Sequence, residues 1–335
     1  LLRELGIESD VVLVATSGGD ALPTLVPMPG NFDHMIVQAE IGGEMYWLDG
    51  TVSGTRLDMI DRVPRFFYVL PLREEGSGLV ALPDRVPRNP EQTIRLTLDQ
   101  RAGIRVPAVF DISIAFRGSA GAPWRAMARL DDGDMREQAI RAAIMGAIGE
   151  AQVIDEALAY DEKRGLATIS GRGILTTAWK EDRGAFRFEA PAQAARDVGF
   201  NADRTRSAWR DIPLRLNGPV HFASEFEILL PAEERFTVEG ALDAAQVIGG
   251  VSLASRVEHA DNRFRLEQTM SSRDAELSAD RISAARGELA RYLRALPVLR
   301  STGDVRQRRQ YFGKDSMRLD PLRAIYDRLV AEAAP

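Results

Sequence analysis

An α+β fold is predicted, in which a smaller unit of short strands and loops precedes a β-rich, sandwich-type domain with helical insertions. Three features of the sequence predict it. Apolar runs of strand length alternate with Pro-rich and Gly-rich loops over residues 1–87. From Gln92 onward, alternating apolar and polar segments recur between turn sequences such as DEKRG and KEDRG. Two segments with helical periodicity interrupt this strand pattern.

The first unit is predicted to span residues 1–87. LLRELGIES has the leucine stripe of a helix end, with Gly6 placed to terminate it, and DVVLVAT has the length and composition of a strand. The prolines of LPTLVPMPGNF predict a loop, and NFDHMIVQAEIGGEMYWLDGT follows as a hairpin. RFFYVLPL and GLVALP are expected to be two further strands. The proline-rich PDRVPRNPEQ then predicts a linker.

The β-rich domain is predicted over residues 88–305. Its strands include TIRLTLDQR, AVFDISIAFRG, LATISGRGILTTAWK and VHFASEFEILLP. One helix is expected near 134–150, where Ile140, Ile144, Ala147 and Ile148 recur at helical spacing, and a second near 278–296. The remaining residues, 306–335, are predicted to form a polar helical tail.

Composition restricts the classes of partner. The chain has 335 residues, with 43 Lys and Arg against 49 Asp and Glu and a net charge of −6, and its arginines are scattered, so no nucleic-acid partner is expected. There is no cysteine, which excludes a disulfide or a thiol nucleophile within these residues. No apolar run has membrane-spanning length, and no secretory leader opens the sequence. Because it begins LLRELG, we expect a piece of a longer protein.

The hairpin places a histidine and an aspartate together. If Gly42 and Gly43 are the central turn residues, residue 36 faces 49 and residue 34 faces 51. His34 and Asp49 are then diagonal neighbours on one face, about 7–8 Å apart between backbones and within side-chain reach. This face also carries Ile36, Gln38, Glu40 and Trp47 and is predicted to lie opposite the core. The other face is predicted to be buried, and it carries Met35, Val37, Ala39, Ile41, Tyr46 and Leu48.

An imidazole and a carboxylate supply two of the three groups of a nucleophilic triad. The carboxylate holds the imidazole tautomer, and the imidazole activates a thiol or hydroxyl. Candidate hydroxyls are Ser17, Thr51 and Ser53, none of which lies on a recognisable strand-to-helix elbow, so a serine triad is not favoured. On pattern alone, a surface pair or a local hydrogen bond is the alternative reading of His34 and Asp49.

The order LLRELGI, VLVAT and FDHMIVQAEIGGEMYWLDGT closely resembles the transglutaminase-like, papain-like core of bacterial proteins that carry a DUF3857 domain ahead of that core. The resemblance is specific over about residues 1–55, and IPLRLNGPVHFASEFEILLPAEERF is similar to the strand-rich module that follows the core. Two departures occur: Asp33 stands where asparagine is frequent, and Gly50 where proline is usual. Neither side chain is expected to take part in chemistry.

The resemblance implies that His34 is the triad histidine and Asp49 the triad aspartate. The family's cysteine lies in a GDCKD-like motif upstream of a segment like LLRELGI, so this chain would hold the later half of the core and be inactive by itself. The implied activity of the intact protein is thioester-mediated acyl transfer on a protein or peptide substrate, as a peptidase, amidase or crosslinker, in the periplasm or cell envelope. Trp47 is expected to shield the pair from water or to cap the core.

A rival hypothesis is a catalytically silent binding or scaffolding module, whose β-rich domain binds an envelope polymer or a protein partner. Neither hypothesis needs a cofactor. His221 and His259 lie far from His34 in the sequence and without clustered carboxylates, so no metal is expected. TSGGD, residues 16–20, lacks the lysine and helix of a phosphate loop, so no nucleotide site is expected.

Overall fold

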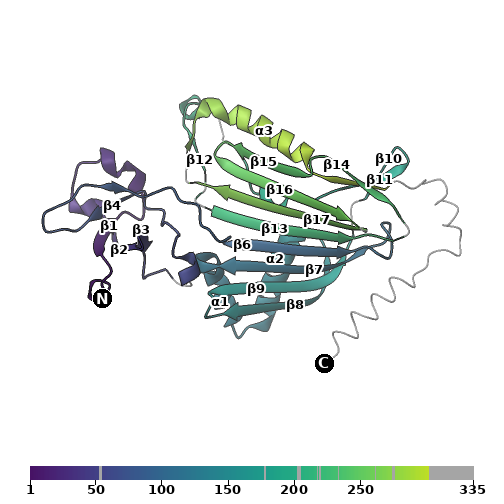
Figure 1. Cartoon of the computed structure of the whole chain (residues 1–335), viewed down its shortest axis with the longest axis horizontal. Coiled ribbons are helices and arrows are strands. Elements are labelled where there is room, and N and C mark those ends of the chain that lie inside the picture. Colours follow the sequence, from purple (N-terminus) through teal and green to yellow (C-terminus); the bar gives the residue numbers. More distant parts are fainter. Residues whose placement is uncertain are drawn as a thin grey trace.

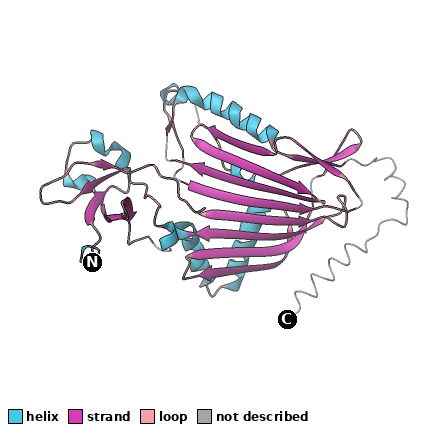
Figure 2. Ribbon diagram, viewed as in Figure 1, coloured by secondary structure: helices cyan, strands magenta, loops and turns pink. Residues whose placement is uncertain are grey.

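The structure is a computed structural model that describes residues 1–301 other than 53–54, 177–178, 202–204, 217, 219, 233, 261 and 274–275. It contains two main sheets, of five and eight strands, which Figure 1 shows as separate units with the smaller sheet at one end of the molecule. Strands make up most of the regular structure (Figure 2). The predicted α+β class with a β-rich domain is therefore confirmed. The predicted tail, 306–335, lies outside the described residues.

The five-stranded sheet has the order β3-β2-β1-β4-β5, and every neighbouring pair is antiparallel. Its strands are β1 (Ser9–Val14), β2 (His34–Ile41), β3 (Glu44–Leu48), β4 (Tyr68–Pro71) and β5 (Val80–Ala81). The proline-rich loop between β1 and β2 forms two short 3₁₀ turns, Gly19–Thr24 and Pro29–Asn31, because its prolines cannot donate to a ladder.

The eight-stranded sheet has the order β15-β16-β17-β13-β6-β7-β9-β8. All neighbours are antiparallel except β13 and β6, which are parallel. The strands are β6 (Gln92–Asp99), β7 (Ala108–Arg117), β8 (Gln152–Asp161), β9 (Leu166–Leu175), β13 (Val220–Leu229), β15 (Asp243–Ile248), β16 (Val251–Ala260) and β17 (Arg263–Ser272). The chain therefore passes from the five-stranded to the eight-stranded sheet between β5, which ends at Ala81, and β6, which begins at Gln92.

In the part of the chain that the structure describes, two small sheets and three α-helices accompany the large sheet. The sheets are β10-β11-β19-β14, with bounds Lys180–Asp182, Ala185–Glu189, Val298–Ser301 and Phe236–Glu239, and β12-β18, with bounds Leu214–Arg215 and Glu276–Leu277. The helices are α1 (Ala122–Ala128), α2 (Gly133–Ile148) and α3 (Ile282–Ala295). Helices were predicted near 134–150 and 278–296, and α2 and α3 lie there. No helix within the described ranges is long and apolar enough to cross a membrane.

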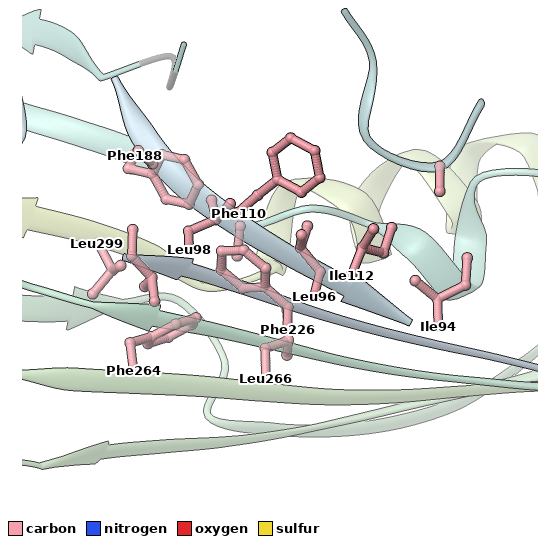
Figure 3. Packing of buried hydrophobic residues seen from close by; sticks show 14 of the residues in the cluster. Ile94, Leu96, Leu98, Phe110, Ile112, Phe188, Phe226, Phe264, Leu266 and Leu299 are labelled. Carbon is pink, nitrogen blue, oxygen red and sulfur yellow. The ribbon is translucent and has the colours of Figure 1, made fainter. Parts of the chain in front are cut away.

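The main core lies between the eight-stranded sheet, α2 and the four-stranded sheet. Phe226 of β13 stacks at 6.0 Å between ring centroids on Phe188 of β11 and meets Phe264 of β17 edge-on at 6.3 Å (Figure 3). On β9, a Cβ at Gly171 would collide with Ile144 of α2, so the glycine permits close helix packing. A second, separate cluster includes Ile248 and Leu253 of the same sheet and Leu289 of α3.

An ion pair and hydrogen bonds connect segments that flank the two main sheets. Arg62, in the segment before β4, pairs with Glu91 at 2.6 Å between Nη2 and Oε1 and donates to the Ser119 hydroxyl. The Asp61 carboxylate accepts from the backbone N–H of Arg88 at 2.8 Å, and Asp61 is only 4% exposed. These contacts fix the segment between β3 and β4 against the β-rich domain, and that segment borders the candidate site.

Candidate functional site

The β2–β3 hairpin brings His34 and Asp49 together. Gly42 and Gly43 have φ values of 63° and 80°, as a type I′ turn requires, and Ile41 pairs with Glu44, which confirms the predicted register. His34 opens β2, and Asp49 follows directly after β3. His34 Nε2 lies 3.0 Å from Asp49 Oδ2, so the predicted contact is confirmed at hydrogen-bonding distance.

The predicted burial of the two hairpin faces is wrong except at Ala39, which is fully buried as predicted. The face of His34 is the buried one: Ile36 and Trp47 are 2% and 7% exposed, whereas Met35 on the opposite face is 61% exposed. The reason is tertiary, because Val12 and Val14 of β1 and Val63 from the segment before β4 pack against Ile36 and Trp47. His34 and Asp49 therefore lie at the end of a packed face, where the surroundings exclude more water than on an open ribbon.

Asp49 is held as a buried carboxylate. Its side chain is 7% exposed, and Oδ1 accepts from the Thr51 amide at 2.9 Å and from the Thr51 hydroxyl at 2.6 Å. Burial opposes ionisation, but the hydrogen bonds from Thr51 and His34 outweigh it and lower the pKa of Asp49 below its ordinary value of 3.8. Thr51, considered above as a nucleophile, instead orients Asp49.

The contact with Asp49 determines which ring nitrogen of His34 is available. An ionised carboxylate only accepts hydrogen bonds, so Nε2 carries the proton and donates to Oδ2. Nδ1 then holds the lone pair of the neutral imidazole. Within the described part of the chain Nδ1 makes no hydrogen bond, and the His34 side chain is 22% exposed. The arrangement leaves Nδ1 as a proton acceptor for an incoming group.

Asp33 positions the start of β2. Its carboxylate accepts from the amide and hydroxyl of Thr16 at 2.8 and 2.5 Å, which ties the end of β1 to the residue next to His34. The hydroxyl and amide of Thr16 lower the pKa of Asp33 below its ordinary value. Asp33 is thus a positioning residue, a role the sequence pattern did not predict.

Phe66 supplies the ring that packs on His34, with ring centroids 5.9 Å apart. It precedes Phe67, whose φ of 64° is left-handed and unusual for a non-glycine residue. A Cβ at Gly19 would collide with the Phe66 carbonyl, so Gly19 permits the close approach of the loop after β1. The Arg215 guanidinium lies 4.4 Å above the Phe67 ring. No local sequence signal links Phe66 to His34.

The other candidate residues are placed as follows. Trp47 packs in the core of the five-stranded sheet, and its shielding role stays a prediction. Ser17 makes no hydrogen bond to His34, and Ser53 lies outside the described residues. His221 bonds through Nδ1 with the Pro87 carbonyl oxygen at 2.9 Å, far along the chain from His34, and His259 lies on β16. Neither joins the site. Within the described ranges, no group of three or more His, Asp or Glu side chains could hold a metal.

Comparisons with known proteins do not place the chain in a family. No family model matches it, and no curated protein matches it. It is similar to the crystal structure of "a putative protease" from Parabacteroides distasonis, with 11% identity and a TM-score of 0.37. The match covers 90% of this chain, and the chain spans 41% of the length of that structure. A likeness this low supports no conclusion about fold or activity.

Asp49→Asn is expected to reduce stability at neutral pH and to have little effect in acid. A carboxyl whose folded pKa is lowered adds stability that is fully present above its unfolded value of about 3.9 and is lost as the pH falls through the folded pKa. At pH 7 we expect the free energy of unfolding of the variant to be about 1–2 kcal/mol lower than that of the parent chain, which is the scale of a hydrogen bond to a charged group. Urea denaturation of the variant and the parent chain measures the difference in the free energy of unfolding at pH 7 and at pH 3. A difference at pH 3 that is as large as at pH 7 contradicts the prediction.

Proposed function

We propose that His34 and Asp49 are the base and the orienting carboxylate of an acyl-transfer centre whose nucleophile is a cysteine thiol supplied from outside these 335 residues. One observation carries the proposal: Nε2 of His34 is held 3.0 Å from a buried Asp49 carboxylate, while Nδ1 has no hydrogen-bond partner among the described residues. The resemblance of residues 1–55 to transglutaminase-like cores supports the choice of a thiol.

The pair can perform both proton transfers of such a reaction. Nδ1 takes the thiol proton, and the Asp49 carboxylate stabilises the imidazolium that results. The thiolate adds to the carbonyl carbon of a carboxamide or peptide bond, the C–N bond breaks, and His34 returns the proton to the departing amine. The thioester is then attacked by water or by a second amine, which gives hydrolysis or crosslinking. The proposed substrate is a protein or peptide of the bacterial envelope.

The proposed centre differs from the chymotrypsin arrangement in its ring geometry. There the carboxylate holds Nδ1, and Nε2 faces the nucleophile. In this chain the carboxylate holds Nε2, so the nucleophile must approach Nδ1. This requirement restricts the position of the thiol to the side of the ring opposite Asp49, which a structure of the complete gene product can test.

The thiolate state is tested by alkylating the complete gene product with iodoacetamide at pH 6, followed by mass spectrometry. We expect fast labelling of one cysteine, slowed on the order of 10–10²-fold by His34→Ala, because an unassisted thiol with a pKa of about 8.5 is largely protonated at pH 6. His259→Ala is the matched control, since this exposed histidine lies on the β-rich domain. Labelling that is indifferent to His34, or the lack of any cysteine, would favour the binding-module hypothesis instead.

A further inference from the structure

A groove of about 610 Å³ lies in the β-rich domain, where the end of α2 meets the eight-stranded sheet. Its floor includes Leu98 of β6 and Phe226 of β13, and one wall is formed by residues between Phe188 and Val198. Leu293 of α3 completes the rim. The volume is within the range of small-ligand sites, and the residues that line it all belong to the β-rich domain.

The groove lies between the two hydrophobic clusters of the domain. Ile148 and Leu175 on its walls pack against the cluster that contains Phe226, whereas Ala192 and Val198 pack against the cluster that contains Leu289. Protein interiors are close-packed, so a gap of this size between two apolar clusters is an exception. Side chains from separate segments thus face a space that the domain itself does not fill.

The walls present apolar surface that a ligand can reach. The floor is packed, since Leu98 and Phe226 are 2% and 3% exposed and belong to the first cluster (Figure 3). The accessible apolar surface belongs to Leu293, which is 39% exposed, and to partly exposed wall residues: Ile148, Leu175, Pro191, Ala192 and Val198. A linear aliphatic chain that lies along these walls buries their surface together with its own.

Arg196 provides a cation at the rim. Its Nη1 donates to the Ala147 carbonyl oxygen of α2 at 3.1 Å, and Gln193 Nε2 donates to the same oxygen at 2.8 Å. These bonds fix the turn that carries Arg196 to the end of α2. Arg196 is exposed and forms no ion pair with a carboxylate of the described residues. Its guanidinium keeps donors for an anion, and its planar shape matches a carboxylate.

The other charged groups nearby do not cancel this cation. Glu189 also lines the groove, but Lys180 and Arg187 lie 3.9 and 3.8 Å from its carboxylate oxygens. Asp197 lines the neighbouring cavity and does not line this groove. Three cations therefore stand against two carboxylates around the rim, which favours an anionic over a cationic head group.

We propose that this groove binds a monomeric fatty acid. The acyl chain lies along the walls between the two clusters, and the carboxylate pairs with Arg196 at the rim. A single free chain is the occupant, because the apolar surface lies on facing walls and not on a flat patch that a bilayer could cover. This binding site goes beyond the proposed function and does not depend on it.

Isothermal titration calorimetry of the whole chain with sodium decanoate, below the concentration at which it forms micelles, tests the proposal. We expect one molecule to bind per chain with a dissociation constant on the order of 10⁻⁴ M. Decyltrimethylammonium has the same tail and the opposite charge, and is expected to bind at least about tenfold more weakly.

Two variants examine the head group and the tail separately. Arg196→Gln removes the cation and is expected to weaken decanoate binding about 3–10-fold. Arg95→Gln is its matched control, since Arg95 is exposed on β6 and projects from the face opposite Leu96. Ala192→Phe places a ring in the groove and is expected to weaken binding at least about tenfold. Ala157→Phe, at an exposed position on β8, is the control for added bulk.

The proposal is overturned if decanoate shows no saturable binding, if the cationic amphiphile binds as tightly, or if Arg196→Gln or a folded Ala192→Phe binds like the parent chain. Should Ala192→Phe fail to fold, Arg196→Gln and the head-group comparison still decide the outcome. His34→Ala is expected to bind decanoate normally, because His34 lies in the five-stranded sheet and does not line the groove. The outcome is thus independent of the thiol-labelling experiment.

Discussion

His34→Ala is expected to lower the rate of acyl transfer by the complete gene product about 10²–10⁴-fold, the usual contribution of a positioned general base. Its Nε2 is held by the buried Asp49 carboxylate at 3.0 Å, and its Nδ1 is the proposed proton acceptor. The rate can be measured as hydroxamate formation from a peptide carboxamide with hydroxylamine as acceptor, which reports thioester formation whether the natural acceptor is water or an amine.

Asp49 variants separate orientation from proton transfer. Asp49→Asn preserves the size of the side chain but cannot stabilise the imidazolium and can hold the wrong tautomer, so a loss of comparable order is expected. Thr51→Val removes one hydrogen bond to Asp49 Oδ1 and leaves His34 in place, so a loss of about tenfold or less is expected. A Thr51 effect as large as that of His34 would contradict the assigned roles.

Phe226→Ala is expected to lower the free energy of unfolding of the β-rich domain by about 3–5 kcal/mol. Phe226 is 3% exposed and lies between Phe188 of the four-stranded sheet and Phe264 of the eight-stranded sheet (Figure 3). Truncation removes apolar burial and two ring contacts at once, and it leaves a cavity between two sheets that cannot both collapse onto it. Urea denaturation of the variant and the parent chain measures the difference.

Two further variants serve as comparisons for the loss of unfolding free energy caused by Phe226→Ala. Phe226→Leu keeps most of the apolar volume and is expected to cost about 1–1.5 kcal/mol. Val247→Ala, on β15 of the same sheet, is 68% exposed and should stay within about 0.5 kcal/mol of the parent chain. If Phe226→Ala costs no more than Val247→Ala, the four-stranded sheet does not pack on the large sheet as described.

The local sequence was sufficient to predict those features of the fold that depend on backbone geometry and on the periodicity of apolar residues. Two consecutive glycines accept the positive φ values of a type I′ turn, and with the turn placed, the twofold alternation of strands set the register of the hairpin. The meeting of His34 and Asp49 follows from that register, although the two are 15 residues apart. The helical spacing of Ile140 and Ile144 likewise predicted α2, which buries both side chains.

Tertiary structure decided which hairpin face is buried, because alternation identifies two faces but not the one that meets the core. The polar residues His34, Gln38 and Asp49 favoured the wrong face, since the valines that cover it come from β1 and from the segment before β4. The support from Asp33 and Phe66 and the groove beside Arg196 also depend on contacts across the fold. The sequence by itself thus determined the two side chains of the candidate pair and their pairing. Only the packing of distant segments determined their burial, the free nitrogen and the groove in the β-rich domain, because desolvation and close contact arise from residues that are remote along the chain.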